Sequence, residues 1–126
     1  MSRETVLRYA EAWQAGDVGT MLGLYAEDFV LHYFGDSPLA GEHIGQAAAL
    51  EALLAASART NRTLVAVDDV LSGDVLHAIV ARERVGADQR EVRRVLLYRA
   101  DEHHLTECWL FDEDQRAIDA LWSVTG

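Results

Sequence analysis

Four strand-like segments follow one another in the second half of the chain, and they limit the fold more than any other feature. They are TLVAVDDVL from Thr63, VLHAIVARERV from Val75, REVRRVLLYRA from Arg90 and HLTECWLF from His104. Alternating apolar and polar residues, interrupted by SGD, GADQ and DEHH, are typical of consecutive antiparallel strands joined by turns. The sequence therefore predicts a four-stranded antiparallel meander.

Helical periodicity dominates the first half of the chain. Residues 3–15 show the apolar spacing of an amphipathic helix, and Gly16 stands after its last turn. Asp17 is a candidate N-cap for a second helix, which we expect to end at residues 27–28. The Ala/Leu-rich run over residues 46–59 has high helix propensity and predicts a third helix.

The stretch FVLHYFGDSPLAGEHIG, residues 29–45, lies between the second and third helices. Its β-branched and aromatic beginning predicts a strand that ends near Gly35, and the rest predicts a turn and a loop that carries His43. A helical pattern returns over residues 112–122, with Asp112 as its candidate cap. Helices followed by a meander predict one α+β domain, residues 1–126, with a curved sheet wrapped on the helices.

Composition excludes several classes of function. Asp and Glu number 21 against 11 Arg and Lys, and the net charge of -10 is unfavourable for binding nucleic acid. No apolar run approaches the roughly 20 residues of a membrane span, and no leader is recognised, so we expect a cytoplasmic protein. Cys108 is the single cysteine, and no metal-ligand spacing surrounds it. We therefore expect neither a disulfide nor a metal, and no cofactor.

Several strings resemble the nuclear transport factor 2-like superfamily in its SnoaL-like and ketosteroid-isomerase-like branch. They are RYAEAWQAGD, LYAEDFV, H..G.SPLAG.H.G and LTECW..DEDQ..ID.LW, which together span nearly the whole chain. The resemblance implies a cone-shaped, cystatin-like α+β barrel with a deep apolar pocket, and a homodimer that pairs through the sheet. Its members include isomerases, polyketide cyclases of secondary metabolism, epoxide hydrolases, dehydratases and non-catalytic proteins, so the fold does not fix the function.

The resemblance can be carried over residue by residue. Tyr9 matches the tyrosine that donates to the oxyanion in ketosteroid isomerases. Tyr33 stands near the position of their aspartate base, and Leu96 near their second oxyanion-hole acid. In the epoxide-hydrolase branch an Arg and an Asp two residues later work with another Asp. Here Arg84 resembles that Arg, whereas Gly86 and Leu110 stand near the positions of the two Asp residues.

His32 is the candidate general base. Imidazole has an ordinary pKa near 6.5, which suits proton abstraction at neutral pH in an apolar pocket. Tyr33 has the opposite strand orientation, so without a bulge only one of these two side chains faces the pocket. Tyr9 and Trp13 share a helix face and form either a pocket wall or core packing.

On the last strand the resemblance favours an inward set that includes Cys108, Leu110 and Asp112. Asp112 then either orients His32 or caps the last helix. On the preceding strand Arg94 has the same orientation as Leu96 and Tyr98, the inward set that the resemblance implies, and it either binds an anionic or carbonyl-bearing ligand or lies on the surface. The residues predicted to contact a ligand are Trp13, Tyr25, Tyr33, His43, Arg94, Tyr98 and Leu110.

The first hypothesis is a small cofactor-independent enzyme, an isomerase or cyclase of the SnoaL-like type. It would act on an apolar, carbonyl-bearing or polyketide-like molecule through His32 as base, Tyr9 as oxyanion donor and Asp112 as the group that orients the histidine. The second is a non-catalytic ligand-binding or dimerisation module. The third is an epoxide or lactone hydrolase that uses water held by His32 and Asp112.

Overall fold

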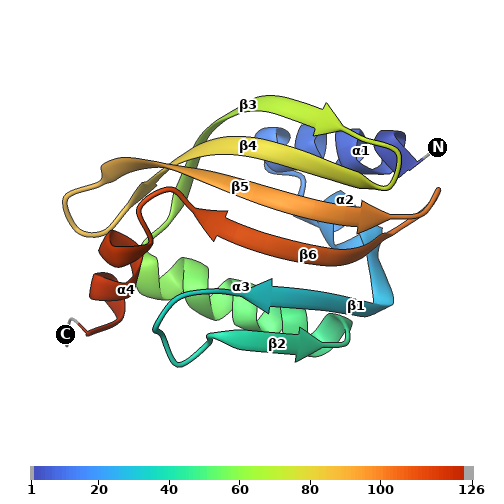
Figure 1. Cartoon of the computed structure of the whole chain (residues 1–126). Coiled ribbons are helices and arrows are strands. Elements are labelled where there is room, and N and C mark those ends of the chain that lie inside the picture. The colour runs from blue at the N-terminus through green and yellow to red at the C-terminus, as the bar shows by residue number, and fades with distance from the viewer. Residues whose placement is uncertain (1, 124–126) are drawn as a thin grey trace.

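One six-stranded sheet forms the frame of the molecule (Figure 1). The computed structural model describes residues 2–123. The strands lie in the order β2-β1-β6-β5-β4-β3. The elements are α1 (Ser2–Ala15), α2 (Val18–Leu24), β1 (Tyr25–Tyr33), β2 (Gly41–Ile44), α3 (Gln46–Thr60), β3 (Thr63–Ser72), β4 (Leu76–Val85), β5 (Arg90–Ala100), β6 (Leu105–Asp112) and α4 (Gln115–Ser123).

The predicted meander is confirmed, because β3, β4, β5 and β6 pair antiparallel in sequence order. The first and third helices are also confirmed to within a residue at their ends. Asp17 caps α2 as expected, since its carboxylate accepts a hydrogen bond from the backbone N–H of Thr20 at 3.2 Å. Gly16 adopts a φ of +71°, a left-handed conformation that glycine adopts without strain. The predicted α+β class is therefore correct.

The predicted end of the second helix is wrong. This helix stops at Leu24, and Tyr25 already belongs to β1, where it pairs with Leu105 of β6. The Tyr25 ring packs edge-on against Phe29 with 4.8 Å between ring centroids. Tertiary packing of two aromatic rings thus favours an extended backbone where the local pattern alone indicates helix.

Two further expectations are corrected. Residues 41–44 are a strand rather than a loop, because β2 pairs antiparallel with β1 and covers its edge. Asp112 does not cap the last helix. Instead the Asp114 carboxylate accepts a hydrogen bond from the backbone N–H of Ala117 at 3.1 Å at the start of α4.

The main core lies between one face of the sheet and helices α1 and α3, which lie on the same side of it (Figure 1). Its largest fully buried side chains include Tyr98, Phe29, Leu31, Ile79 and Leu105. None of the helices in the described part of the chain combines the length and the apolar character needed to cross a membrane.

Gly35, just after β1, provides a test of how α4 docks. It has a φ of +105°, and a Cβ there would lie 2.3 Å from Asp119 Oδ1 and 2.4 Å from Gln115 Nε2 on α4. Gly35→Ala should therefore lower the free energy of unfolding by about 2 kcal/mol, through backbone strain plus displacement of these side chains. Urea unfolding measures the change.

The matched control is Gly41→Ala. Gly41 also has a left-handed φ, +123°, but a Cβ there would meet no atom within 4 Å. This variant should lose only the strain, about 1 kcal/mol. Equal losses in the two variants would show that α4 does not pack against Gly35.

Candidate functional site

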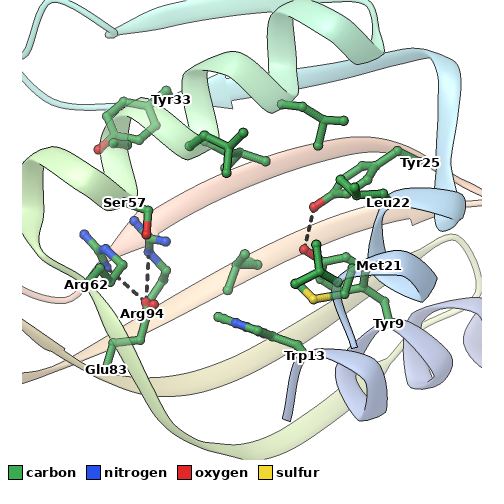
Figure 2. Close-up of a pocket in the computed structure, with 16 residues that line it drawn as sticks. Tyr9, Trp13, Met21, Leu22, Tyr25, Tyr33, Ser57, Arg62, Glu83 and Arg94 are labelled. Atoms are coloured by element: carbon green, nitrogen blue, oxygen red, sulfur yellow. Dashed lines mark hydrogen bonds and ion pairs between the residues drawn. The ribbon is translucent and has the colours of Figure 1, made fainter. Parts of the chain in front are cut away.

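A cavity of about 220 Å³ lies between the inner face of the sheet and helices α1, α2 and α3 (Figure 2). Its walls are mostly apolar and aromatic. They include Trp13 from α1, Met21 and Leu22 from α2, Leu50 and Leu53 from α3, and Leu96 from β5. Such an enclosure suits the body of a small apolar molecule.

One end of this cavity is polar, because charged side chains from neighbouring elements meet there (Figure 2). Glu83 on β4 and Arg94 on β5 both point to the inner face, and Asp112 lies opposite Arg94 in the β5–β6 register. Arg62 joins them from the residue that precedes β3. We call Arg62, Glu83, Arg94 and Asp112 the ion cluster.

Both arginines of the ion cluster contact both carboxylates. Arg62 Nη1 lies 3.0 Å from Glu83 Oε1 and 3.2 Å from Asp112 Oδ1. Arg94 Nε lies 3.5 Å from Glu83 Oε1 and 3.2 Å from Asp112 Oδ1. All four side chains are at most 7% exposed. The cluster is neutral overall, so each buried charge is compensated.

Burial alone would lower the pKa of Arg94, because it disfavours the charged guanidinium. The carboxylates of Glu83 and Asp112 outweigh this effect, and the pKa of Arg94 is raised above its ordinary value. Arg94 therefore stays a fixed cation at the polar end of the cavity.

Two buried donors at this polar end have no hydrogen-bond partner among the described residues. They are the hydroxyl of Tyr33 and Nη2 of Arg62, and both residues line the cavity. Burial raises the pKa of Tyr33 against the opposing effect of Arg94 and Arg62, so the phenol keeps its proton. A third such atom, Nε1 of Trp122, is only a donor; it lowers the pKa of Tyr33 as a donor towards the phenolic oxygen, but it cannot accept a hydrogen bond from Tyr33 or Arg62. Buried polar groups without a partner are rare in folded proteins.

The opposite end of the cavity is closed by aromatic rings. The hydroxyls of Tyr9 and Tyr25 are hydrogen-bonded to one another (Figure 2), and Tyr98 lies behind them with its ring centroid 5.7 Å from that of Tyr9. Burial raises the pKa of Tyr9 to about 12 and that of Cys108 to about 12. These groups are therefore neutral at physiological pH.

A family model described as the SnoaL-like domain matches residues 6–116. The chain belongs to the SnoaL-like family. A comparison with curated proteins finds no significant match. The sequence match thus identifies the SnoaL-like domain without an activity.

Solved structures share the SnoaL-like fold. A Xanthomonas campestris protein of unknown function with a cystatin-like fold is 25% identical, with a TM-score of 0.85 over 98% of this chain and 100% of that chain. An NTF2-like protein from Burkholderia xenovorans is 23% identical, with a TM-score of 0.70 over 95% and 94%. A putative polyketide cyclase from Sinorhizobium meliloti is 16% identical, with a TM-score of 0.65 over 86% and 94%.

Four of the residues that we expected to contact a ligand line the cavity of this SnoaL-like domain, namely Trp13, Tyr25, Tyr33 and Arg94. Tyr9, the expected oxyanion donor, also lines it. Tyr98 and Leu110 point to the same side of the sheet but are buried in the core and are not part of the lining. The resemblance therefore predicts correctly which side chains of β5 and β6 point to the inner face of the sheet.

The expected position of His32 is wrong. Tyr33 faces the cavity, so the alternation of β1 turns His32 to the other face of the sheet. There its ring stacks on Trp109 with 5.0 Å between centroids, and its Nε2 is hydrogen-bonded to Glu107 Oε2 at 2.6 Å. Its Nδ1 lies 3.4 Å from Glu42. His32 therefore cannot act as a base in this cavity.

Asp112 and His43 also differ from expectation. Asp112 does not orient His32, because its carboxylate is held by Arg62 and Arg94 on the inner side of the sheet. His43 lies on β2, where its Nε2 donates to the carbonyl oxygen of Leu39 at 2.7 Å, and it is not part of the cavity lining.

Glu83 and Arg62 were missed as site residues. Arg84, which resembles the arginine of the epoxide-hydrolase branch, is exposed, and the arginines next to Glu83 in space are Arg62 and Arg94. Glu83 lies two residues from Ala81 and from Val85, so it shares their buried face of β4, and this spacing was the available indication that Glu83 points inward. Arg62 lies outside any periodic element, so no sequence pattern indicated it. In the described part of the chain, no group of three or more His, Cys, Asp or Glu is arranged to hold a metal.

The unpartnered phenol of Tyr33 predicts an unusual change in stability. Tyr33→Phe removes a buried hydroxyl without a partner, so the free energy of unfolding of the unliganded protein should rise by about 1 kcal/mol. Tyr9→Phe is the control, because it removes a hydroxyl that is hydrogen-bonded to Tyr25 and should lower the same quantity by about 1 kcal/mol. Equal destabilisation of both variants in urea would show that Tyr33 has a partner after all.

Proposed function

We propose that this protein binds a small, largely apolar, carbonyl-bearing molecule in the cavity and transfers protons on it, as an isomerase or cyclase does. The observation that carries the proposal is the pair of buried donors, Tyr33 hydroxyl and Arg62 Nη2, which have no acceptor. The polyketide cyclase among the structural neighbours is consistent with this type of reaction.

The two donors define the role of the polar end. A carbonyl oxygen placed there accepts hydrogen bonds from Tyr33 and Arg62, and both bonds strengthen as the oxygen becomes an enolate. Because the ion cluster is already neutral, a neutral carbonyl compound fits better than a ligand that carries a full negative charge. The apolar body of the ligand then extends towards Tyr9 and Tyr25.

Glu83 replaces His32 as the proposed base. Of the two carboxylates in the ion cluster, Glu83 lines the cavity and Asp112 does not. The contacts from Arg62 and Arg94 fall on Oε1 of Glu83, which leaves Oε2 to receive a proton from the carbon next to the carbonyl. Asp112 then holds the two arginines in position.

The arrangement also supports a second candidate, the hydrolysis of an epoxide or lactone. Arg94 lies between the carboxylates of Glu83 and Asp112, which come from the two strands that flank β5. Such a group of charges can hold a water molecule and the oxygen of a strained ring. Hydrolysis in water enriched in ¹⁸O would place the label in the product, whereas isomerisation would not.

Exchange of hydrogen for deuterium tests the acid–base proposal. The protein should accelerate exchange of the α-hydrogens of 2-tetralone, a bicyclic ketone, in D₂O, as followed by proton NMR. Glu83→Gln should lower this rate by about 10²–10⁴-fold, because the isosteric amide cannot accept the proton. Circular dichroism checks that the variant is folded.

Glu107→Gln is the matched control. Glu107 lies on the other face of the sheet beside His32, so its variant should exchange 2-tetralone at the wild-type rate. Full exchange activity in Glu83→Gln would contradict the assignment of the base. Binding of 2-tetralone to the wild-type protein without any exchange would favour the non-catalytic ligand-binding module instead.

We also propose that two copies associate through the outer face of the sheet. Phe34 and Phe111 stack there with 5.0 Å between ring centroids and are 40% and 43% exposed. Trp109 lies on the same face, with the Arg99 guanidinium 6.0 Å from the centre of its ring. Exposed aromatic residues grouped in this way are typical of protein interfaces.

Charge introduced into this face should disrupt the proposed dimer. Phe111→Glu should shift the sedimentation coefficient from the dimer to the monomer, because a carboxylate would be buried without a partner. Leu54→Glu, at a position on α3 that is 69% exposed on the opposite side of the sheet, is the control and should leave the mass unchanged. A wild-type protein that sediments as a monomer would contradict the proposal directly.

A further inference from the structure

A second hollow lies beside the cavity and shares part of its wall. This groove, of about 490 Å³, is bordered by the end of α1, residues 14–16, and by the start of β3, residues 63–65. Two residues, Trp13 and Arg62, belong to the linings of both the cavity and the groove. They therefore form the partition between an enclosed apolar space and a more open one.

The groove differs from the cavity in its chemistry. Its lining includes Gln14 and Thr63, and both residues are exposed. The amide oxygen of Gln14 accepts a hydrogen bond from the backbone N–H of Val67 at 3.2 Å. Arg62 is the one charged residue in this lining, and its guanidinium is already paired with Glu83 and Asp112. The groove thus favours an uncharged substituent that forms hydrogen bonds, rather than an ion or an alkyl chain.

Arg62 places the carbonyl site at the junction of the two spaces. Its free Nη2 is one of the two donors without an acceptor, and the same residue borders the groove. A carbonyl carbon bonded to this oxygen has two substituents. In this arrangement one substituent would lie in the apolar cavity, and the other would extend past Trp13 and Arg62, which border both spaces, into the groove.

We propose that the natural ligand is an ester- or amide-type carbonyl compound, whose apolar acyl part fills the cavity and whose uncharged polar part lies in the groove. This inference rests on the proposed function, because it uses the same carbonyl site. It assigns Trp13 a role in specificity: the indole limits the width of the group that joins the two parts. Ketones without a polar group beyond the carbonyl are then poorer ligands than esters of matching shape that carry one.

Two esters of 2-naphthoic acid test the proposal by isothermal titration calorimetry. Methyl 2-naphthoate fills only the cavity, whereas 2-(2-hydroxyethoxy)ethyl 2-naphthoate adds a polar tail for the groove. The wild-type protein should bind the tailed ester more tightly. Thr63→Trp fills the groove from an exposed position, and it should weaken the tailed ester about tenfold, equivalent to about 1.4 kcal/mol, while the methyl ester is unaffected.

Two further variants complete the design. Val65→Trp fills the same groove from another residue of β3 and should give the same result if Thr63→Trp does not fold. Leu71→Trp adds the same ring on that strand outside both linings, and it should bind both esters as the wild-type protein does.

The outcomes separate this inference from the proposed function. If methyl 2-naphthoate does not bind, or binds Tyr33→Phe as tightly as the wild type, the carbonyl site is wrong and both proposals fail. If the methyl ester binds through Tyr33 but the affinity for the tailed ester is unchanged by Thr63→Trp and Val65→Trp, only the groove assignment is overturned. A loss of affinity for the tailed ester alone, in either groove variant, supports the groove assignment.

Discussion

The inner side of this domain depends on the mutual neutralisation of four buried charges. The ion cluster joins the residue before β3 to β4, β5 and β6, so that it links four consecutive segments of the chain. Removing one partner of such a cluster leaves a buried charge without compensation, which typically costs about 3–5 kcal/mol. The same charges define the polar end of the cavity, so stability and the chemistry of the site share one set of side chains.

The cavity combines this compensated cluster with donors that are not compensated. The hydroxyl of Tyr33 and Nη2 of Arg62 are buried beside charged groups that are paired with one another. A fold that keeps such donors without a partner is less stable than it would be with apolar groups in their place. Under the function that we propose, the ligand supplies the missing acceptor, and binding removes that penalty.

Most of the fold could be predicted from the sequence, but only part of the candidate site could be. The meander and the long helices follow from periodicity over ten or more residues. The alternation of β5 put Arg94 on the same face as Leu96, but the choice between a ligand contact and a surface position stayed open until the structure showed Arg94 buried. The choice between His32 and Tyr33 needed the register of β1 against β6, a tertiary pairing that single-strand alternation does not supply. Arg62 follows a helix and precedes a strand, so its convergence with Glu83 exists only in three dimensions.

The parallel pairing of β1 with β6 has a consequence for how the domain folds. Leu31 lies opposite Cys108, so the first strand joins the meander through its last strand, β6. Contacts between such distant segments close long loops and form slowly. Tyr33 sits on that first strand, whereas the ion cluster lies on β4 to β6 and the residue before β3, so the meander can assemble its charges before the cavity is closed. On this argument the wall of the cavity that carries Tyr33 forms late, after the meander that carries the ion cluster.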